Sequence, residues 1–314
     1  LRNNLNISAE ELSKYYVTEE GKVYHIGFTA NGETYYNADL KLVEYTMSEV
    51  MAQGLNLTEG TVASISTAQE LKDLATYTNS GNNTKHVTFK LTSDINLNEG
   101  TTFAYEETTG LVNVNVNGTT YTIGTGVDKY VDNTDTLQTI TTASTEGEIK
   151  DSTSAVVTEI PNVNKWIPIG TYEYNVKDIP FEGVFDGQNN KISGIYINTD
   201  KAYQGLFGVI ENAVVQNVVV ENSYVYSSGA ERNNPTGTYL TTGVGGVIGW
   251  SGNSNISSCV NNAIVQGIRH VGGIVGQATD GGTIKECTNN GAVLGSNIVR
   301  KLNNMTIERI FIGG

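Results

Sequence analysis

The residue types that perform acid–base, nucleophilic or metal chemistry are sparse in this chain of 314 residues. The three histidines, His25, His86 and His270, are scattered, and no two have the i, i+4 spacing that places two imidazoles on one face of a helix. Polysaccharide hydrolysis needs two convergent carboxyl groups, and Ca²⁺-dependent elimination needs several. Asp178 and Asp186 do not recur at a regular interval. We therefore expect no catalytic residue, no cofactor and no metal site.

Aromatic side chains offer binding chemistry instead. Four of them lie in or beside stretches of loop-like composition: Tyr224, Tyr226, Tyr239 and Trp250. A tyrosine ring combines an apolar face with a polar tip, which suits stacking against sugars and contacts with proteins. These four residues are the candidate ligand contacts. In the alternative interpretation, Tyr224 and Tyr226 alternate along a strand that has one buried face.

The two cysteines, Cys259 and Cys287, occupy equivalent positions of two similar segments, so they become neighbours if those segments stack. Adjacent strands lie about 4.8 Å apart, which is compatible with the Cα separation of a disulfide. A disulfide is therefore one prediction. The other is a reduced pair of small apolar side chains in the core, because stacked side chains in register rarely have the torsion angle that a disulfide requires.

A sequence repeat must position these residues. Three tetrapeptides begin and end with glycine, at 205–208, 246–249 and 273–276, and the segment 256–267 is echoed 28 residues later at 284–295. Self-similarity at this period indicates a solenoid or array. The apolar runs are short and β-branched, with Gly, Asn and Ser between them, which is typical of short strands joined by turns.

The repeat length favours one turn of a parallel β-helix, since a propeller blade needs roughly 40 residues. We expect the glycines to occupy tight corners, where other residues are sterically forbidden. Stacking predicts two ladders of like residues on successive turns. Their members are Asn222, Asn262 and Asn290, and Val225, Val265 and Val293.

Two capping boxes predict helices outside the repeat. Ser8 with Glu11 indicates a short helix that ends near Tyr16. Thr67 with Glu70 begins a helix whose face of Leu71, Leu74 and Ala75 would cover the open end of the stacked strands.

Turn signals predict two hairpins, at Asn31-Gly32 and at Asn117-Gly118. The second lies within an interruption of the repeat at about 98–160. This insertion is either a binding module or a lateral layer that covers an exposed sheet face. A smaller loop of inserted residues is expected at about 226–242.

Beyond the glycine motifs, an ordered set of segments resembles the GLUG-motif β-helix domains of bacterial surface and secreted proteins. The segments are Ile65–Leu71, Phe89–Leu97, Trp166–Gly170 and Pro180–Ile195, and the resemblance covers about 65–297. It implies a right-handed parallel β-helix outside the cell, with adhesive or structural roles and no shared catalytic residues.

The N-terminal segment resembles type IV pilin-like proteins of Gram-positive bacteria. The similar residues are Lys14–Tyr24 and Gly32–Tyr36. In that family a long hydrophobic helix precedes this stretch, so the resemblance implies that such a helix was removed ahead of Leu1.

Composition agrees with an extracellular location. There are 19 basic and 33 acidic residues, which give a net charge of −14, and such acidity disfavours nucleic acids and anionic membranes. No apolar run is long enough to span a bilayer. We expect neither nucleic acid nor membrane contact by this segment.

The sequence thus predicts a mainly β protein: a right-handed parallel β-helix with a short N-terminal α/β segment, a capping helix and inserted hairpins. The expected divisions are an N-terminal segment, a cap with the first turn, an insertion, the repeats and a C-terminal strand, at 1–60, 61–97, 98–160, 161–300 and 301–314. The expected function is that of a secreted or surface-displayed adhesin or structural display module that binds a glycan or protein on a host or neighbouring cell. The alternatives are a subunit that self-assembles into a pilus-like filament and a polysaccharide-active enzyme.

Overall fold

The computed structural model describes residues 44–126, 145–172, 178–229, 243–279 and 281–295, together with the backbone of eight short strands outside these ranges. The predicted helix at 8–14 and most of the loop at 226–242 lie outside the described residues. The protein is mainly β, and its sheets are largely parallel, as predicted.

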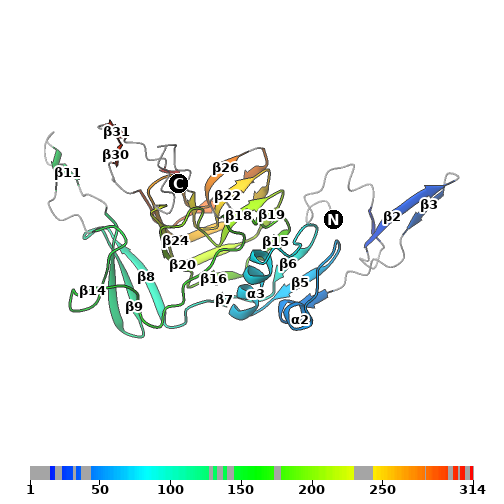
Figure 1. Cartoon of the computed structure of the whole chain (residues 1–314), viewed down its shortest axis with the longest axis horizontal. Coiled ribbons are helices and arrows are strands. Elements are labelled where there is room, and N and C mark those ends of the chain that lie inside the picture. The colour runs from blue at the N-terminus through cyan, green and yellow to red at the C-terminus, as the bar shows by residue number, and fades with distance from the viewer. Residues whose placement is uncertain are drawn as a thin grey trace.

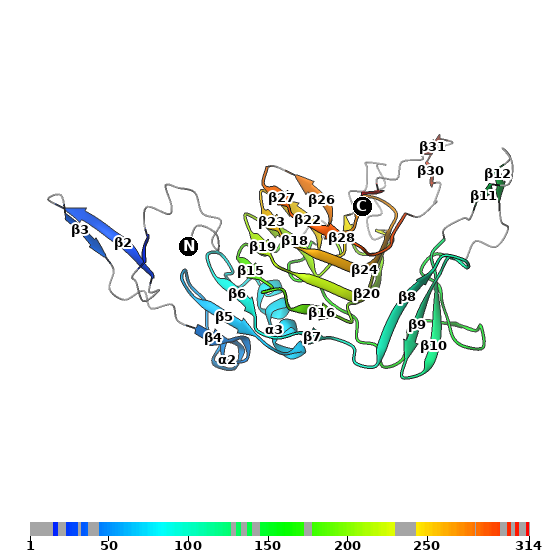
Figure 2. The same cartoon turned by 180° about the vertical axis from the view of Figure 1, so that it is seen from behind.

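One seven-stranded parallel sheet runs through the molecule, and each return of the chain adds a strand beside the preceding one. Figure 2 shows its strands following one another in chain order. They are β4 (Glu44–Thr46), β5 (Val62–Ile65), β6 (Thr88–Leu91), β15 (Val184–Asp186), β19 (Val214–Gln216), β23 (Asn255–Ser257) and β27 (Thr283–Lys285).

A second parallel sheet is built in the same way (Figure 1). Its strands are β7 (Ile95–Asn96), β16 (Lys191–Ser193), β17 (Tyr196–Thr199), β20 (Val219–Ser227), β24 (Val260–Gly267), β28 (Thr288–Asn289) and β29 (Val293–Gly295). Two three-stranded parallel sheets comprise β18 (Phe207–Glu211), β22 (Ile248–Gly252) and β26 (Val275–Thr279), and β21 (Val244–Gly245), β25 (Val271–Gly272) and β32 (Ile312–Gly313). We call these four sheets the parallel stack.

The sequence repeat sets the register of the parallel stack. The third residues of the glycine tetrapeptides pair in order, Phe207 with Ile248 and Ile248 with Val275. The valine ladder is confirmed, because Val225 pairs with Val265, which pairs with Val293.

The asparagine ladder is confirmed for two of its three members. Asn290 Nδ2 donates to Asn262 Oδ1 at 2.9 Å. Asn222 was wrongly included, because the register of β20 shifts at a bulge and Glu221 takes the place opposite Asn262.

The glycines of the tetrapeptides serve close approach rather than left-handed corners, so the predicted reason for them was wrong. None of the six has a φ in the left-handed region. A Cβ on Gly276 would lie 2.3 Å from the backbone nitrogen of Val244. The left-handed corners fall instead on Asn217, Ser258 and Glu286, which are equivalent positions with φ of 54°, 53° and 55°.

The interior of the parallel stack is apolar and contains a cluster of phenylalanine rings. Phe181 lies 5.5 Å from Phe89 and 5.3 Å from Phe207, measured between ring centroids, and Phe185 contacts Phe207 at 5.1 Å. All four side chains are fully buried. Because Phe89 precedes the insertion and the other three residues follow it, the cluster joins the segments on the two sides of the insertion into one core.

Two helices pack beside the first strands of the stack (Figure 2). Helix α3 (Ala68–Asn79) begins at Thr67 as predicted, and Leu71, Leu74 and Ala75 are buried. Helix α2 (Met47–Gln53) was not predicted, although Thr46 and Glu49 form a complete capping box. At Thr67 only half of the predicted box is present, because Thr67 accepts from Glu70 N while the Glu70 carboxylate binds Ser66 instead.

The insertion forms an antiparallel sheet, here called the inserted sheet. It consists of β8 (Thr101–Glu106), β9 (Leu111–Val116), β10 (Thr119–Gly124), β13 (Ile149–Lys150) and β14 (Val156–Val157). Strands β9 and β10 form the predicted hairpin, since Val116 pairs with Thr119 across Asn117-Gly118.

The inserted sheet covers the outer face of the second parallel sheet. Val112, Val114 and Ile123 belong to one buried cluster with Tyr196 and Tyr224 of the parallel stack. Of the two interpretations of the insertion, the structure therefore supports a lateral layer over a sheet face.

Short strands outside the fully described ranges pair locally. They are β1 (Tyr15–Val17), β2 (Val23–Ala30), β3 (Glu33–Tyr36), β11 (Tyr130–Asp132), β12 (Leu137–Thr139), β30 (Arg300–Leu302) and β31 (Met305–Ile307). Ala30 pairs with Glu33, which is the predicted hairpin at Asn31-Gly32. Tyr15 and Tyr16 lie in β1, so the prediction of a helix through Tyr16 is wrong at that end.

A buried carboxylate joins the two helices. Glu70 accepts hydrogen bonds from Ser66 N and Ser66 Oγ, both at 2.8 Å, and from Ser48 Oγ at 2.9 Å. Burial raises the pKa of Glu70, but these hydrogen bonds outweigh it, so the pKa is lowered overall. A lowered pKa gives stability that is full above the pKa of an unfolded glutamate and is lost as the pH falls through the folded pKa.

We expect Glu70→Gln to lower the free energy of unfolding by about 1–3 kcal/mol at neutral pH, because it removes a charged acceptor from three donors. The deficit should shrink as the pH is lowered toward about 3, because the stability that comes from the lowered pKa of Glu70 is progressively lost below the pKa of an unfolded glutamate. Urea unfolding at both pH values measures it. Glu44→Gln, at an exposed position, is the charge-matched control. An equal deficit at both pH values would contradict the assignment.

A second test concerns the contact between the inserted sheet and the parallel stack. Tyr224 Oη donates to Gln266 Oε1 at 2.9 Å, and Gln266 Nε2 donates to Thr125 O at 2.8 Å. Tyr224→Phe should cost about 1–2 kcal/mol, because it leaves a buried amide oxygen without its donor. Thermal or urea unfolding measures the loss. Tyr121→Phe removes a hydroxyl that has no hydrogen bond among the described residues and should change stability by less than about 0.5 kcal/mol. Similar effects of the two variants would refute the role of Tyr224.

Candidate functional site

Two of the four predicted ligand contacts lie inside the protein. Tyr224 and Tyr226 are 0 % and 4 % exposed and pack beneath the inserted sheet. Their rings lie 6.4 Å apart, and burial raises the pKa of both hydroxyls. The prediction that they contact a ligand is wrong, and the alternative of a strand with a buried face holds. The cover comes from residues about a hundred positions earlier, which local sequence cannot reveal.

Of the other two predicted contacts, Tyr239 and Trp250, the structure places only the second. Tyr239 lies outside the described residues. Trp250 is half-buried on β22, and its ring centroid lies 6.3 Å from that of Tyr203. Tyr203 in turn contacts Tyr172 edge to face, at 5.0 Å and an interplanar angle of 87°. We call Tyr172, Tyr203 and Trp250 the aromatic row.

The backbone of Tyr203 is held in an unfavourable conformation. Its φ is +48°, in the left-handed region that residues other than glycine rarely adopt. The neighbouring Gln204 is fixed at both its backbone groups, because its N–H donates to Gly243 O at 3.0 Å and its carbonyl accepts from Gly245 N at 3.0 Å. A strained residue that its surroundings hold in place is often found at a binding site.

Two members of the aromatic row, Tyr172 and Tyr203, border a cleft of about 290 Å³. One wall is the segment that leads from the inserted sheet back to the stack, and the other is β17 with the residues that follow it. The side chains that line the cleft include Lys165, Trp166, Ile167, Pro168, Thr171, Tyr172, Ile197, Asn198, Thr199, Lys201, Tyr203 and Gln204. We call this space the cleft.

Hydrogen bonds fix the first wall of the cleft against the stack. Trp166 N donates to Tyr196 O at 2.9 Å, and Trp166 Nε1 donates to Leu206 O at 3.1 Å. Gly170 N donates to Asn79 Oδ1 at 2.9 Å. The buried Trp166 therefore anchors the wall, while Ile167 beside it is 65 % exposed.

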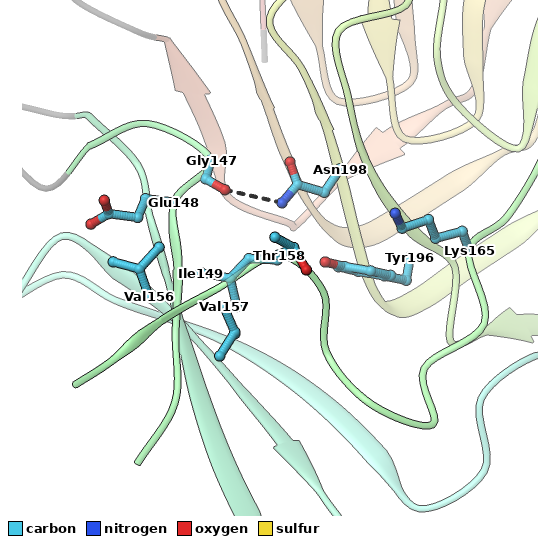
Figure 3. A pocket seen from close by; sticks show the side chains of 9 residues that line it. All are labelled: Gly147, Glu148, Ile149, Val156, Val157, Thr158, Lys165, Tyr196 and Asn198. Atoms are coloured by element: carbon cyan, nitrogen blue, oxygen red, sulfur yellow. Dashed lines mark hydrogen bonds between the residues drawn. The ribbon is translucent and has the colours of Figure 1, made fainter. Parts of the chain in front are cut away.

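A second cavity of about 220 Å³ adjoins the cleft, because Lys165 and Asn198 line both. Figure 3 shows it between β17 and the residues of β13 and β14. Asn198 Nδ2 donates to Gly147 O at 3.2 Å and ties these two sides together. We refer to the cleft and this adjoining cavity together as the groove.

Tyr196 contributes a protonated hydroxyl beside this cavity. Burial raises its pKa to about 12, the carboxylate of Glu159 adds to the effect, and Asn198 opposes it. The hydroxyl can therefore donate a hydrogen bond throughout the physiological pH range.

The groove carries positive charge in an acidic protein. Lys165 and Lys201 are exposed, and neither forms an ion pair with a carboxylate in the described ranges. Glu148, which also borders the second cavity, is paired with Lys150 at 3.0 Å. Within the part of the chain that the structure describes, these two lysines are therefore available for an anionic group.

Reactive clusters are not found in the described part of the chain. It holds no group of three or more His, Cys, Asp or Glu side chains that could bind a metal ion, and no helix there is long and apolar enough to cross a membrane. Asp186 has a structural role, since it accepts from Gln188 N at 3.0 Å, Gln216 Nε2 at 3.1 Å and Asn217 Nδ2 at 2.9 Å.

The two cysteines lie side by side as free thiols, Cys259 buried and Cys287 half-buried. Each immediately precedes a residue of a parallel pair, since Val260 is opposite Thr288. The stacking that the repeat predicted is therefore present.

Sequence reasoning missed Tyr172, Tyr203 and the two lysines of the groove. Tyr203 lies two residues before the first glycine tetrapeptide, and Lys165 directly precedes the Trp166–Gly170 segment. Their positions next to segments where the repeat begins or is interrupted could have marked them as candidate site residues.

Comparison with known proteins identifies one of the repeats. A family profile described as "Glug: The GLUG motif" matches residues 267–294. No curated protein and no solved structure matches the chain. The matched residues include the third glycine tetrapeptide and Cys287, so the chain has a GLUG-containing domain.

Proposed function

We propose that this protein is a non-catalytic saccharide-binding module that acts in adhesion outside the cell. The observation that carries the proposal is the groove, where the half-buried ring of Tyr172, amide and hydroxyl side chains, and two lysines that pair with no carboxylate of the described residues lie together. The filament subunit and the polysaccharide-active enzyme remain predictions from sequence alone.

The proposed scaffold is a right-handed parallel β-helix. Support comes from the addition of strands to the parallel sheets in chain order, with 27 residues between the paired Ile248 and Val275 and 28 between the paired Asn255 and Thr283. Right-handed crossovers are the rule for parallel strands of one sheet. Such a scaffold is rigid, which suits a binding site that must hold its shape under load.

The lining of the groove matches the chemistry of sugars. Apolar C–H faces of pyranose rings pack on aromatic rings, and the half-buried Tyr172 presents such a ring, whose orientation is fixed by its edge-to-face contact with the buried Tyr203. Asn198, Thr199 and Thr171 are half-buried hydrogen-bonding side chains beside them. A volume of about 290 Å³ lies at the lower end for ligand sites and suits one or two sugar rings.

The charges of the groove favour acidic sugars over neutral ones. Lys165 and Lys201 flank the cleft and can pair with a carboxylate of a uronic or sialic acid. The net charge of −14 repels polyanions elsewhere on the protein. A short acidic saccharide that enters the groove avoids most of this repulsion.

Binding to an array of immobilised oligosaccharides, both neutral and uronic or sialic acid-containing, tests the proposal. We expect the wild type to bind and Tyr172→Ala to reduce affinity about tenfold, because the ring that stacks on the sugar is removed. Tyr172→Phe keeps the ring and should bind nearly as well as the wild type. Failure of the folded wild type to bind any saccharide, or equal binding by the alanine variant, would overturn the proposal.

Charge recognition has a separate test. The double variant Lys165→Ala, Lys201→Ala should weaken binding of an acidic oligosaccharide roughly three- to tenfold and leave its neutral counterpart nearly unchanged. Lys90→Ala with Lys285→Ala, at exposed positions outside the groove, is the matched control. Titration calorimetry at low and high salt gives the affinities, and the acidic ligand alone should show salt dependence. Equal losses for the two ligands would contradict the role of the lysines.

A further inference from the structure

Cys259 and Cys287 lie on the boundary between the last fully described repeat and the one before it. The backbone is tightly paired there, because Ser258 N donates to Lys285 O at 3.1 Å and Thr288 N donates to Cys259 O at 2.9 Å. Hydrogen bonds on both sides of the cysteines hold their Cα atoms at the spacing of adjacent strands, about 4.8 Å, which lies within the range for disulfides.

The two thiols differ in access to solvent. Cys259 is 0 % exposed and lies against the core, with its Sγ 3.4 Å from Ser257 O. Cys287 is half-buried, and its Sγ lies 3.3 Å from Lys285 O. A reagent from solvent can therefore reach Cys287 but not Cys259.

The side chains of the last fully described repeat, on one side of this boundary, are poorly buried. Residues 281–295 are mostly exposed or half-buried, and Ile284 is 49 % exposed. Strands β27, β28 and β29 attach this repeat to its neighbour through two or three paired residues each. A covalent link at this boundary would hold the last repeat on the stack.

We propose that Cys259 and Cys287 form a two-cysteine exchange site, which reacts with a low-molecular-weight disulfide through Cys287 and closes to an intramolecular disulfide. The Cys287 thiolate attacks one sulfur of the reagent, so a mixed disulfide forms and one small thiolate leaves. Cys259 then loses its proton to solvent and attacks Cys287 Sγ, and the second small thiolate leaves. Two thiols are oxidised, and one reagent disulfide is reduced to two thiols.

Electrostatics support this order of events. A hydrogen bond from the Cys259 thiol lowers the pKa of Cys287, whereas the same interaction and burial raise the pKa of Cys259. The thiolate at neutral pH is therefore on the accessible sulfur, where attack must begin.

Oxidised glutathione is the probe, applied to the folded full chain and followed by intact mass and peptide mapping. Arg269 and Lys285 place the cysteines in separate tryptic peptides, so a cross-link is directly visible. We expect the wild type to lose two hydrogens and to yield the cross-linked peptide pair. Its melting temperature should rise by roughly 5 °C on oxidation, because the link closes a loop of 28 residues.

Two variants separate the steps. Cys259→Ala should stop at a glutathione adduct on Cys287, whereas Cys287→Ala should form no adduct until it is unfolded in urea. Melting curves of both variants confirm that they are folded. Two free thiols in the treated wild type, a persistent adduct there, or only intermolecular cross-links would overturn the proposal. Adduct formation at equal rates in the two folded variants would also overturn it.

Discussion

Hydrogen bonding between successive repeats is the constraint on which the rest of this structure depends. Each short strand finds its backbone partners in the repeat before and the repeat after, so the path of one repeat must copy that of the next. This explains why the third residues of the glycine tetrapeptides pair in register. It also explains the glycines, since backbones meet so closely there that a Cβ on Gly276 would lie 2.3 Å from Val244 N.

The inserted sheet binds the stack at the point where the pairing register between β20 and β24 shifts. The bulge in β20 frees Asn222 from its ladder, and its side chain then binds the inserted sheet: Oδ1 accepts from Phe103 N at 3.0 Å, and Nδ2 donates to Thr101 O at 2.9 Å. Asn98 secures the base of the insertion, since it donates to Asn164 O at 2.9 Å and accepts from Asn164 N at 2.7 Å. The insertion is therefore a second layer fixed to the stack by specific hydrogen bonds.

Features encoded locally were predictable from the sequence, and features that depend on distant segments were not. The Thr67 cap, the hairpin at Asn117-Gly118 and the valine ladder each follow from a short motif or from the period itself. The burial of Tyr224 depends on which surface the inserted sheet covers, and the residues around Tyr224 do not predict the position of that sheet. The contact between Tyr203 and Tyr172 likewise joins residues about thirty positions apart, with strands β15, β16 and β17 between them in the chain.

The position of the groove follows from the same constraint. Within the regular repeats, polar side chains are used between neighbours, as in the bond of Asn261 Nδ2 to Asn289 Oδ1 at 2.8 Å, and apolar ones are buried in the core or under the inserted sheet. Side chains that neither hydrogen-bond to a neighbouring repeat nor pack in the core occur where the chain leaves the repeat and returns to it. Lys165 lies on the return from the insertion, and Lys201 and Tyr203 lie on the approach to the first glycine tetrapeptide. The cleft therefore lies between β17 of the stack and the segment that returns from the insertion, and the residues at these interruptions of the repeat supply the side chains that line it.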